Sequence, residues 1–429
     1  MPFFDPIRIG ASGVSDTAFT VNRSVRYNRS DNPYFSKQPS SAGNRRTFTI
    51  STWVKRSNQD LNGALFYAGT SVGANHDDTD SFIFNSSNQI NFVGEESQTV
   101  KYDLKTTRFF RDPAAWYHIV LAVDTTQGTA SNRIKLYVNG VQETSFATET
   151  YPSQNYELFV NSTVSGGYTS GNIHVVGYTG GGRGLDGYLA EFHLIDGQQL
   201  TPSSFAETNS DTGQWVPIDT SGLTFGTNGF RLKFRDNSGT TATTLGKDSS
   251  GNGNNFTPSN FGTGDAVKDT PTNNFCTFLS IQKTAETTFT EGNLKGVNDA
   301  THKTLYGNFG LRSGKWYWEA EATSGSATKY TYGVSDIKNT INTQVSGTNY
   351  LLAVSSGSPS NATYAYGDAV SIYRDDLYKN GSVVTNSYQT APSAGDIIGI
   401  ALDVDAGKVW FARNGTWING SASASTTLD

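Results

Sequence analysis

Oxygen-bearing side chains gather in one short stretch of the sequence, DSSGNGNN at residues 248–255. Asp248, Asn252 and Asn254 stand close together among small residues, and carboxylate and amide oxygens are the hard ligands that Ca²⁺ takes in proteins. The stretch lacks the bidentate glutamate at a fixed offset that completes a calcium loop. A turn in which Asp and Asn hydrogen-bond their own backbone explains the same residues. The sequence therefore predicts a loop that either binds structural Ca²⁺ or forms such a turn.

Aromatic side chains in loop-like stretches could stack on sugar rings, with Asn, Asp and Arg nearby to bind hydroxyl groups. A lone Trp or Tyr in a β-rich protein is more often a packing residue, so both interpretations stay open for each candidate. The candidate carbohydrate-binding residues are Tyr151, Tyr156, Tyr168, Tyr178, Arg183, Trp215 and Trp417. Tryptophans inside strand-like patterns are predicted to lie in cores, and these are Trp53, Trp116, Trp316, Trp318 and Trp410.

The residue patterns do not favour catalysis. A retaining glycosidase needs two carboxylates about 5 Å apart, and no E-x-D-x-x-E run that could supply them occurs. Glu319 and Glu321 share one strand face, and we predict that this face is solvated. The five histidines lack metal-site spacing, and GGGRG at 180–184 lacks the Lys-Ser/Thr of a phosphate loop. The sequence predicts a protein that is not an enzyme.

The composition limits the class of protein. The 429 residues are 35% hydrophobic and 16% charged, but 12% are aromatic and the net charge is only −6, so disorder is not indicated. This acidic balance does not favour nucleic-acid binding. Cys276 is the sole cysteine, which excludes an internal disulfide. The N-terminal residues do not have the pattern of a secretory leader. No run of about eighteen apolar residues occurs, so membrane insertion is not predicted.

Period-two alternation recurs along the chain and helical periodicity is nearly absent, so the predicted fold class is all-β. Turn clusters at intervals of roughly ten residues are typical of β-sandwiches. We predict two antiparallel jelly-roll or β-sandwich domains, at 25–207 and 275–429. An irregular connector at 208–274, rich in Gly, Ser and Asn, joins them and contains one strand, GFRLKF (229–234).

One strand-and-turn pattern occurs twice. IKLYVNGVQ (134–142) and KVWFARNGTW (408–417) alternate apolar and polar residues until they reach Asn-Gly, which supplies the two positive-φ positions of a type I′ turn. Similar strands precede them, WYHIVLAVD (116–124) and DIIGIALDVD (396–405). We predict one such hairpin in each sandwich, and LYKNG (377–381) is a third instance of the turn.

These motifs resemble two known families. FTISTWVKRS, WYHIVLAVD, IKLYVNGV and GLDGYLAEFHLIDGQQLTPSSF (184–205) resemble laminin-G and pentraxin domains, which have the concanavalin A-like jelly-roll fold. In the last sequence motif of that family's domain, an Asp-Gly hairpin precedes a strand whose Glu side chain points inward. SGKWYWEAEAT, YTYGVSD and GDIIGIALDVDAGKVWFARNGTW resemble a SPRY domain. SPRY domains continue for several strands after the hairpin, so we expect another chain or a longer product to supply strands beyond SASASTTLD.

Further stretches resemble large virion proteins of tailed bacteriophages, especially marine and cyanobacterial ones. IRIGASG and SVRYNRSDNPYFSKQ near the N-terminus carry this resemblance, together with DSSGNGNNFTPSNF and DTPTNNF in the connector. It implies a virion protein that is assembled in the host cytoplasm. Residues 1–24 would attach it to other virion proteins, and a homo-oligomer is expected because phage fibres are usually trimers.

Three functions follow from these expectations. The favoured one is a non-enzymatic tail fibre or fibre-like appendage that binds host surface glycans. The alternative is a purely structural head-decoration or tail-scaffold protein. A capsule-degrading glycosidase fits least well, because the sequence lacks the paired carboxylates. No cofactor is expected other than the structural Ca²⁺ considered above.

Overall fold

The computed structural model describes residues 19–69, 78–163, 172–280, 287–298, 305–321, 323, 331–335, 369–373, 375–379, 382–418 and 426–427. In these ranges the chain is all-β, with short 3₁₀ turns and no α-helix, as the alternation predicted. None of the helices described has the length and apolar character to cross a membrane. The described residues fall into two compact units. The first extends to residue 280 and includes Phe289–Gly296, and the second contains the remainder.

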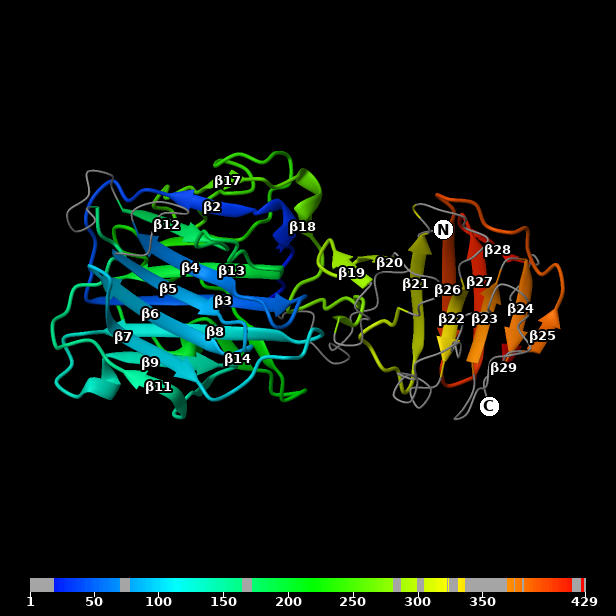
Figure 1. Cartoon of the computed structure of the whole chain (residues 1–429), viewed down its shortest axis with the longest axis horizontal. Coiled ribbons are helices and arrows are strands. Elements are labelled where there is room, and N and C mark those ends of the chain that lie inside the picture. Colours follow the sequence, from blue (N-terminus) through cyan, green and yellow to red (C-terminus); the bar gives the residue numbers. More distant parts are fainter. Residues whose placement is uncertain are drawn as a thin grey trace. The chain divides into compact units, whose positions relative to one another are not determined.

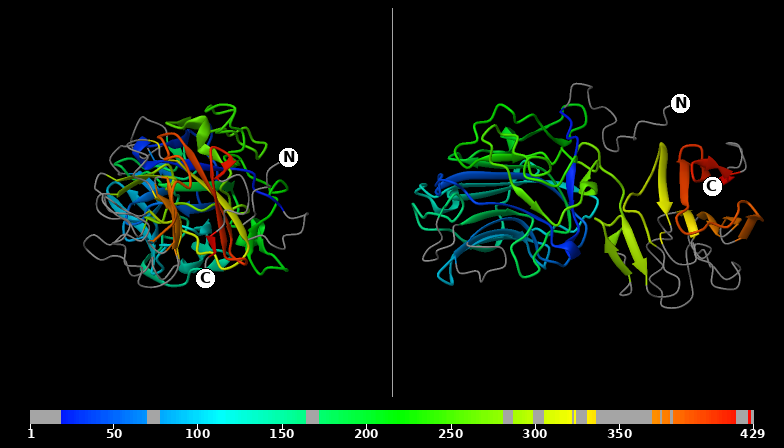
Figure 2. Two further views of the ribbon diagram at one scale, coloured as in Figure 1. Left: turned by 90° about the vertical axis from the view of Figure 1, so that its right-hand side faces the viewer. Right: turned by 90° about the horizontal axis from the view of Figure 1, so that it is seen from above.

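The first unit contains two eight-stranded antiparallel sheets, which lie over one another as two layers (Figure 1, Figure 2). Sheet 1 has the order β10 (Val141–Gln142), β9 (Ile134–Val138), β8 (Trp116–Asp124), β3 (Thr47–Arg56), β13 (Gly187–Asp196), β1 (Ser24–Tyr27), β18 (Ala266–Val267), with β16 (Phe230–Leu232) paired to β13. Sheet 2 has the order β11 (Phe146–Thr150), β7 (Thr99–Thr106), β6 (Ile90–Glu96), β5 (Asp78–Phe84), β4 (Gly63–Gly69), β12 (Ile173–Val176), β2 (Tyr34–Lys37), β17 (Thr257–Ser259).

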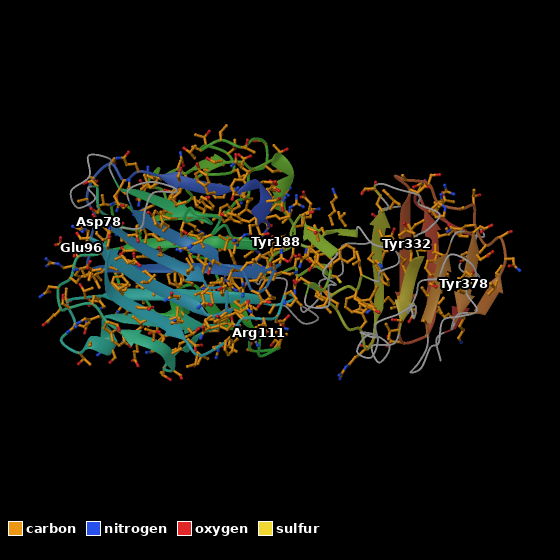
Figure 3. All side chains as sticks on the ribbon, in the orientation of Figure 1. Asp78, Glu96, Arg111, Tyr188, Tyr332 and Tyr378 are labelled. Atoms are coloured by element: carbon orange, nitrogen blue, oxygen red, sulfur yellow. The ribbon has the colours of Figure 1, made fainter. Side chains whose placement is uncertain are left out.

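The main core lies between these two sheets, because alternate residues of each strand point into it. In β9, for example, Ile134, Leu136 and Val138 are buried while the residues between them are half-exposed. Phe66 and Phe82 of sheet 2 join the same buried cluster. At one end of sheet 2, Asp78 of β5 lies opposite Glu96 of β6 (Figure 3).

The outward face of sheet 1 is buried as well. Trp53 packs with residues such as Ala206 and Trp215, and Val120 packs with Phe205 and Phe225. The segment that covers this face includes the ladder of β14 (Ala206–Thr208) with β15 (Trp215–Pro217). Both faces of sheet 1 are therefore buried. In a sandwich of only two layers, the outward face of the sheet would be exposed to solvent.

The segment at 208–274 belongs to the first unit, whereas the sequence suggested a connector between domains. Three of its strands extend the two sheets, because β16 pairs with β13, β17 with β2 and β18 with β1. Local sequence patterns do not predict this pairing, because β1 and β2, the partners of β18 and β17, lie more than 200 residues away along the chain.

Both predicted Asn-Gly hairpins are confirmed. Asn139 and Gly140 have φ of 47° and 82°, and Asn414 and Gly415 have 49° and 77°, the two positive values of a type I′ turn. Each asparagine also accepts a hydrogen bond from the start of the preceding strand. The His118 N–H donates to the Asn139 side chain at 2.7 Å, and the Ile397 N–H donates to Asn414 at 2.9 Å. The third instance, LYKNG, ends outside the described residues.

The second unit contains a five-stranded and a four-stranded antiparallel sheet. Sheet 3 has the order β21 (Lys315–Glu321), β26 (Ile397–Asp403), β27 (Lys408–Arg413), β28 (Thr416–Trp417), with β29 (Thr426–Thr427) also paired to β27. Sheet 4 has the order β22 (Thr331–Ser335), β23 (Ala369–Tyr373), β24 (Asp376–Lys379), β25 (Ser382–Thr385). Val370 and Ile372 of sheet 4 share a core with Ile400 and Phe411 of sheet 3. A further two-stranded ladder pairs β19 (Thr287–Thr290) with β20 (Lys295–Asn298).

Of the five tryptophans predicted to lie in cores, four pack in or against a core and one does not. Trp53 is buried and Trp116 packs against the cluster around it, and Trp316 and Trp318 pack against the core of the second unit. For Trp410 the prediction is wrong. Val409 and Phe411 take the two core positions of β27, and Trp410, between them, is half-exposed on the opposite face.

Candidate functional site

The aromatic residues that the sequence suggested as carbohydrate-binding candidates do not lie together in one site. Tyr151 and Tyr156 pack against the main core of the first unit, and Tyr156 meets Tyr102 edge-on. Trp215 lies on the other side of sheet 1, where its indole N–H donates to Nδ1 of His118 at 3.0 Å. Tyr168 lies outside the described residues. Trp417 belongs to the second unit. A carbohydrate role for each of them stays a prediction, and the contacts of Tyr156 and Trp215 are those of packing residues.

Tyr178 has the surroundings that a sugar-stacking residue needs. It directly follows the turn after β12, and its ring stacks on Tyr34 of β2 with centroids 5.8 Å apart and planes inclined by 19°. The two rings come together because β2 and β12 are neighbours, with Phe35 opposite Val176. Both tyrosines are half-exposed. The pair forms an aromatic surface where the end of β12 meets the start of β2, which the sequence alone could not predict.

A guanidinium group ties the neighbouring loop to this surface. Arg29, in the 3₁₀ turn η1 (Arg29–Asp31), donates to the carbonyl oxygens of Asn62, Gly182 and Gly184. Burial lowers the pKa of Arg29, and the nearby Asp186 and Tyr178 act in the opposite direction. The guanidinium is thus held beside Tyr178, where it ties the loop that contains Asn62 to the loop between β12 and β13.

The loop between β12 and β13 is open at its tip. Gly180, Gly181 and Gly182 have φ of 91°, 57° and 74°, a run of left-handed residues that only glycine adopts without strain. Gly181 and Gly182 are exposed, and the candidate Arg183 next to them is half-exposed. A ligand could therefore approach the backbone here closely.

Amide and carboxylate groups complete the polar part of the corner. The Asn58 side chain donates to Asp186, and the Asn62 side-chain oxygen accepts from the Ser86 N–H at 2.9 Å. We call Tyr34, Tyr178, Arg29, Arg183 and Asn62 the tyrosine corner. Sequence reasoning found Tyr178 and Arg183 but missed Tyr34 and Arg29, because both lie in the N-terminal strand region and meet Tyr178 only through strand pairing.

The acidic residues of strand β13 do not form a catalytic pair. Glu191, the glutamate of the 184–205 motif, is buried at a bulge in β13 and accepts from Nε of Arg231 at 2.7 Å. Arg231 is fully buried and also reaches Asp219 at 3.4 Å. Glu191 thus compensates a buried cation, which leaves it unsuited to act as an acid or base on a substrate.

In the second unit, Glu319 and Glu321 occupy exposed positions on one face of β21, as predicted. Glu319 accepts a hydrogen bond from the Tyr317 hydroxyl at 2.8 Å. Within the ranges that the structure describes, no group of three or more His, Cys, Asp or Glu side chains is placed to hold a metal ion.

The oxygen-rich loop at 248–255 has the geometry of a turn. One carboxylate oxygen of Asp248 accepts from the N–H groups of Arg231 and Ser250, and the other accepts from the Asn254 N–H and the Ser250 hydroxyl. The side-chain amides of Asn252 and Asn254 donate to backbone carbonyls, including that of Gly229. These donors occupy the oxygen atoms of Asp248 that Ca²⁺ would need.

We therefore expect chelation to leave the first unit unaffected. Protein dialysed against Ca²⁺ should melt at the same temperature before and after addition of EDTA, because the donors of the loop satisfy Asp248 without a cation. A fall of several degrees after EDTA, restored by Ca²⁺ and lost in Asp248→Asn, would instead assign calcium to this loop. Differential scanning fluorimetry on the full chain measures both outcomes.

Comparisons with known proteins agree with the architecture. Residues 29–197 match the Laminin_G_3 family model, described as "Concanavalin A-like lectin/glucanases superfamily", and residues 315–427 match the SPRY domain model. No curated protein matches the sequence.

Several solved structures are similar to part of the chain. A heptameric SAP-like pentraxin from Limulus polyphemus is 15% identical, with 48% of this chain and 100% of that chain covered and a TM-score of 0.32. The carbohydrate-binding module CBM40 of a Ruminococcus gnavus sialidase is 14% identical, with 39% and 94% covered and a TM-score of 0.27. Domain 4 of an extracellular arabinanase from Geobacillus stearothermophilus is 17% identical, with 38% and 65% covered and a TM-score of 0.26. Likenesses this distant say nothing about function. Two β-sandwich regions of this chain are thus similar to family models, residues 29–197 to a concanavalin A-like laminin-G model and residues 315–427 to a SPRY model.

Proposed function

We propose that this chain is a non-enzymatic binding protein whose first unit binds carbohydrate at the tyrosine corner. The observation that carries the proposal is the half-exposed stack of Tyr34 on Tyr178 beside the guanidinium of Arg29. Aromatic rings offer the apolar face of a sugar a flat partner, and guanidinium and amide groups bond its hydroxyls. The family model that matches the first unit includes lectins in its description.

The absence of paired catalytic carboxylates at the described corner supports a binding role over hydrolysis. Asp186, the carboxylate that contacts the corner, is hydrogen-bonded by Asn58. Glu191 is held by Arg231. Glycosidases need one carboxyl to protonate the leaving oxygen and a second to attack or to activate water. Two such groups facing a common sugar are not found among the described residues of the corner, so we propose binding without cleavage.

The biological setting that we propose is the virion of a tailed bacteriophage. The chain would be a tail fibre or fibre-like appendage that is assembled in the host cytoplasm and binds host surface glycans. Residues 1–24 would attach it to other virion proteins, and the chain would form a homo-oligomer. This proposal is supported by the resemblance of the stretches quoted above. The alternative, a structural head-decoration or tail-scaffold protein, would use the same sandwiches as docking modules.

Replacing Tyr178 by alanine is expected to weaken glycan binding by about tenfold or more, because a stacking platform contributes on the order of 1.4 kcal/mol or more. Tyr34→Ala should have an effect in the same direction, since Tyr34 supports the ring of Tyr178. The measurement is binding of the purified full chain to an array of neutral and acidic oligosaccharides, followed by titration of the best ligand.

Phe109→Ala provides a matched control, because Phe109 is an exposed aromatic of the same unit on the loop between β7 and β8. It should leave binding unchanged. If wild type and Tyr178→Ala bind every glycan on the array equally well, the tyrosine corner is overturned. A complete lack of binding by the wild type would favour the structural alternative, and release of new reducing ends would revive the glycosidase.

A further inference from the structure

The outward face of sheet 3 in the second unit presents exposed aromatic rings. Tyr317 of β21 is 49% exposed and Trp417 of β28 is 38% exposed. Trp410 of β27 is half-exposed between them in the strand order. Exposed apolar side chains that gather into one patch mark a ligand- or partner-binding site, whereas scattered single ones do not.

Strand register places the three rings on one face. Tyr317 lies opposite Ala401, and Ala401 lies opposite Trp410. In the next row Gly399 lies opposite Ala412, and Ala412 lies opposite Trp417. Directly opposed residues of an antiparallel sheet point to the same side. The core residues Ile400 and Phe411 stand at the alternate positions and point the other way.

A glycine in the neighbouring strand lets the ring of Tyr317 lie close over the sheet. A Cβ atom at Gly399 would come within 2.6 Å of the Tyr317 hydroxyl, so the ring of Tyr317 reaches across the glycine. The Tyr317 hydroxyl donates to Glu319 at 2.8 Å, which holds the ring in that orientation. Trp417 reaches inward over Ala412 and meets Tyr317 edge-on, with centroids 6.4 Å apart. With Trp410 on the same face, these rings form the aromatic platform of sheet 3, made of Tyr317, Trp410 and Trp417.

The charges around the platform nearly balance. Lys315 and Asp403 form an ion pair at 3.3 Å at one end of the row. Lys408, opposite Asp403, is exposed, and Glu319 is exposed on the other side of Tyr317. Such a rim provides both donors and acceptors for hydroxyl groups and has no strong preference for a charged ligand.

The size of the platform indicates a small ligand. Among the residues that the structure describes, the face offers three rings, the small residues between them and a few charged side chains. This is well below the roughly 20–30 residues that each side of a specific protein–protein interface contributes. Exposed aromatic rings beside hydrogen-bonding groups match the alternating apolar faces and hydroxyl edges of pyranose sugars. A short neutral glycan satisfies both the apolar and the polar parts of this face.

We propose that the outward face of sheet 3 is a second carbohydrate-binding site, which takes a neutral oligosaccharide along Tyr317, Trp417 and Trp410. Sugar rings stack on the aromatic side chains, and Glu319 and Lys408 bond hydroxyl groups at the rim. The site is built from the second unit alone. It stands whether or not the tyrosine corner of the first unit binds sugar.

The test uses the full chain and its variants on an array of neutral oligosaccharides, including β-glucan, α-glucan, xylan and mannan fragments. Trp417→Ala and Tyr317→Ala are each expected to lower binding to one set of neutral glycans by about tenfold, and the double variant should abolish it. Tyr178→Ala should leave that same set unaffected. Val384→Ala is the matched control, because Val384 is an exposed residue of sheet 4 in the same unit.

Three results would overturn the proposal. One is a wild type that binds none of the neutral fragments. Another is a set of bound glycans that stays unchanged in the Tyr317→Ala and Trp417→Ala double variant. The third is loss of self-association in the double variant, measured by analytical ultracentrifugation with glycan binding unaltered, which would assign the face to a protein contact. Hydrogen exchange at β26 and β27 confirms that each variant is folded, and Trp417→Phe should retain most of the binding.

Discussion

Replacing Lys55 by methionine is expected to destabilise the first unit by about 3–5 kcal/mol, the loss typical of a buried ion pair deprived of one partner. The side chain of Lys55 is 1% exposed and that of Asp269 is 7% exposed, with Nζ and Oδ2 2.8 Å apart. Lys55 also donates to the Asn274 side chain at 2.8 Å and to the Phe275 carbonyl at 2.6 Å. Methionine would leave these acceptors and a buried carboxylate without their cation.

The charge of Asp269 is the source of the expected loss. Burial raises the pKa of Asp269, while Lys55 and the hydrogen bond from the Trp116 indole act in the opposite direction. Asp269→Asn added to Lys55→Met should therefore recover part of the stability, because it removes the uncompensated charge and keeps an acceptor. Lys247→Met, at an exposed lysine of the same unit, should change the free energy of unfolding by less than about 0.5 kcal/mol.

Hydrogen-exchange mass spectrometry in urea measures this effect for each unit separately, because peptides from β3 and β13 report on the first and peptides from β26 and β27 on the second. Lys55→Met should lower the protection of the first set alone. An unchanged midpoint for β3 and β13 peptides in that variant would contradict the assigned role of the pair.

Acidification is expected to destabilise the first unit by about 3 kcal/mol between pH 7 and pH 5, from the pKa values of its buried groups. Burial lowers the pKa of His118 and of His174 to about 3. Their stabilising contribution is complete above the ordinary pKa of about 6.5 and is lost as the pH falls toward 3, because the unfolded chain then binds protons that the folded one does not. Together the two histidines account for a loss of about 4 kcal/mol by pH 5.

Asp80 opposes this loss in part. Burial raises the pKa of Asp80 to about 6, although the Tyr102 hydroxyl and the Val160 N–H donate to it at 2.5 and 2.7 Å. A raised carboxyl pKa stabilises the folded state most at low pH. Between pH 7 and pH 5, Asp80 therefore offsets about 1 kcal/mol of the loss of stability caused by the histidines. The pKa of His193 is also lowered by burial and by Arg231, which acts in the same direction as the other two histidines.

The hydrogen bonds of His118 explain why its neutral form is required. Nδ1 accepts from the Trp215 indole at 3.0 Å, so Nε2 carries the proton toward the Ser51 hydroxyl at 2.9 Å. His118→Gln should reduce the difference in stability between pH 7 and pH 5 by about 2 kcal/mol, whatever it does to stability at pH 7. Urea unfolding at both pH values measures that difference. A wild type that is equally stable at both would contradict the assignment.

The sequence was sufficient for the strands and hairpins because their signals are local. Alternation within each strand predicted β8, β9, β26 and β27, and Asn-Gly predicted both type I′ turns, since only a few residue types adopt two positive φ angles in succession. The resemblance to laminin-G and SPRY domains was also carried by stretches of continuous sequence, and both family models match the chain.

The sequence could not predict interactions that depend on distant segments. Nothing near Lys55 indicates that it is buried, because its partner Asp269 lies in a segment that meets β3 only in the folded unit. Arg231 is a charged residue in a strand-like stretch, where exposure would be usual, yet it is fully buried against Glu191. Trp410 was expected in a core because it lies inside a strand-like pattern, but the core side of β27 is already filled by Val409 and Phe411.

The candidate site likewise combines residues that the sequence suggested with residues that only the structure reveals. Tyr178 and Arg183 could be nominated from their loop, whereas Tyr34 and Arg29 reach the tyrosine corner through the pairing of β2 with β12 and through the loop before β13. Trp417 was nominated alone, and its neighbours Tyr317 and Trp410 become visible only when the register of sheet 3 is known. A binding surface on a sheet collects one residue from each of several strands, so spacing along the chain does not reveal it.

We propose that the first unit holds a sugar at the tyrosine corner without cleaving it. A crystal structure of the full chain with its best-bound oligosaccharide would show whether it does. We predict an intact glycan with one ring stacked on Tyr178 and its hydroxyl groups near Arg183 and Asn62. A glycan bound elsewhere in the first unit, at Tyr151 or Trp215 for example, or a shortened product at the corner, would contradict the account.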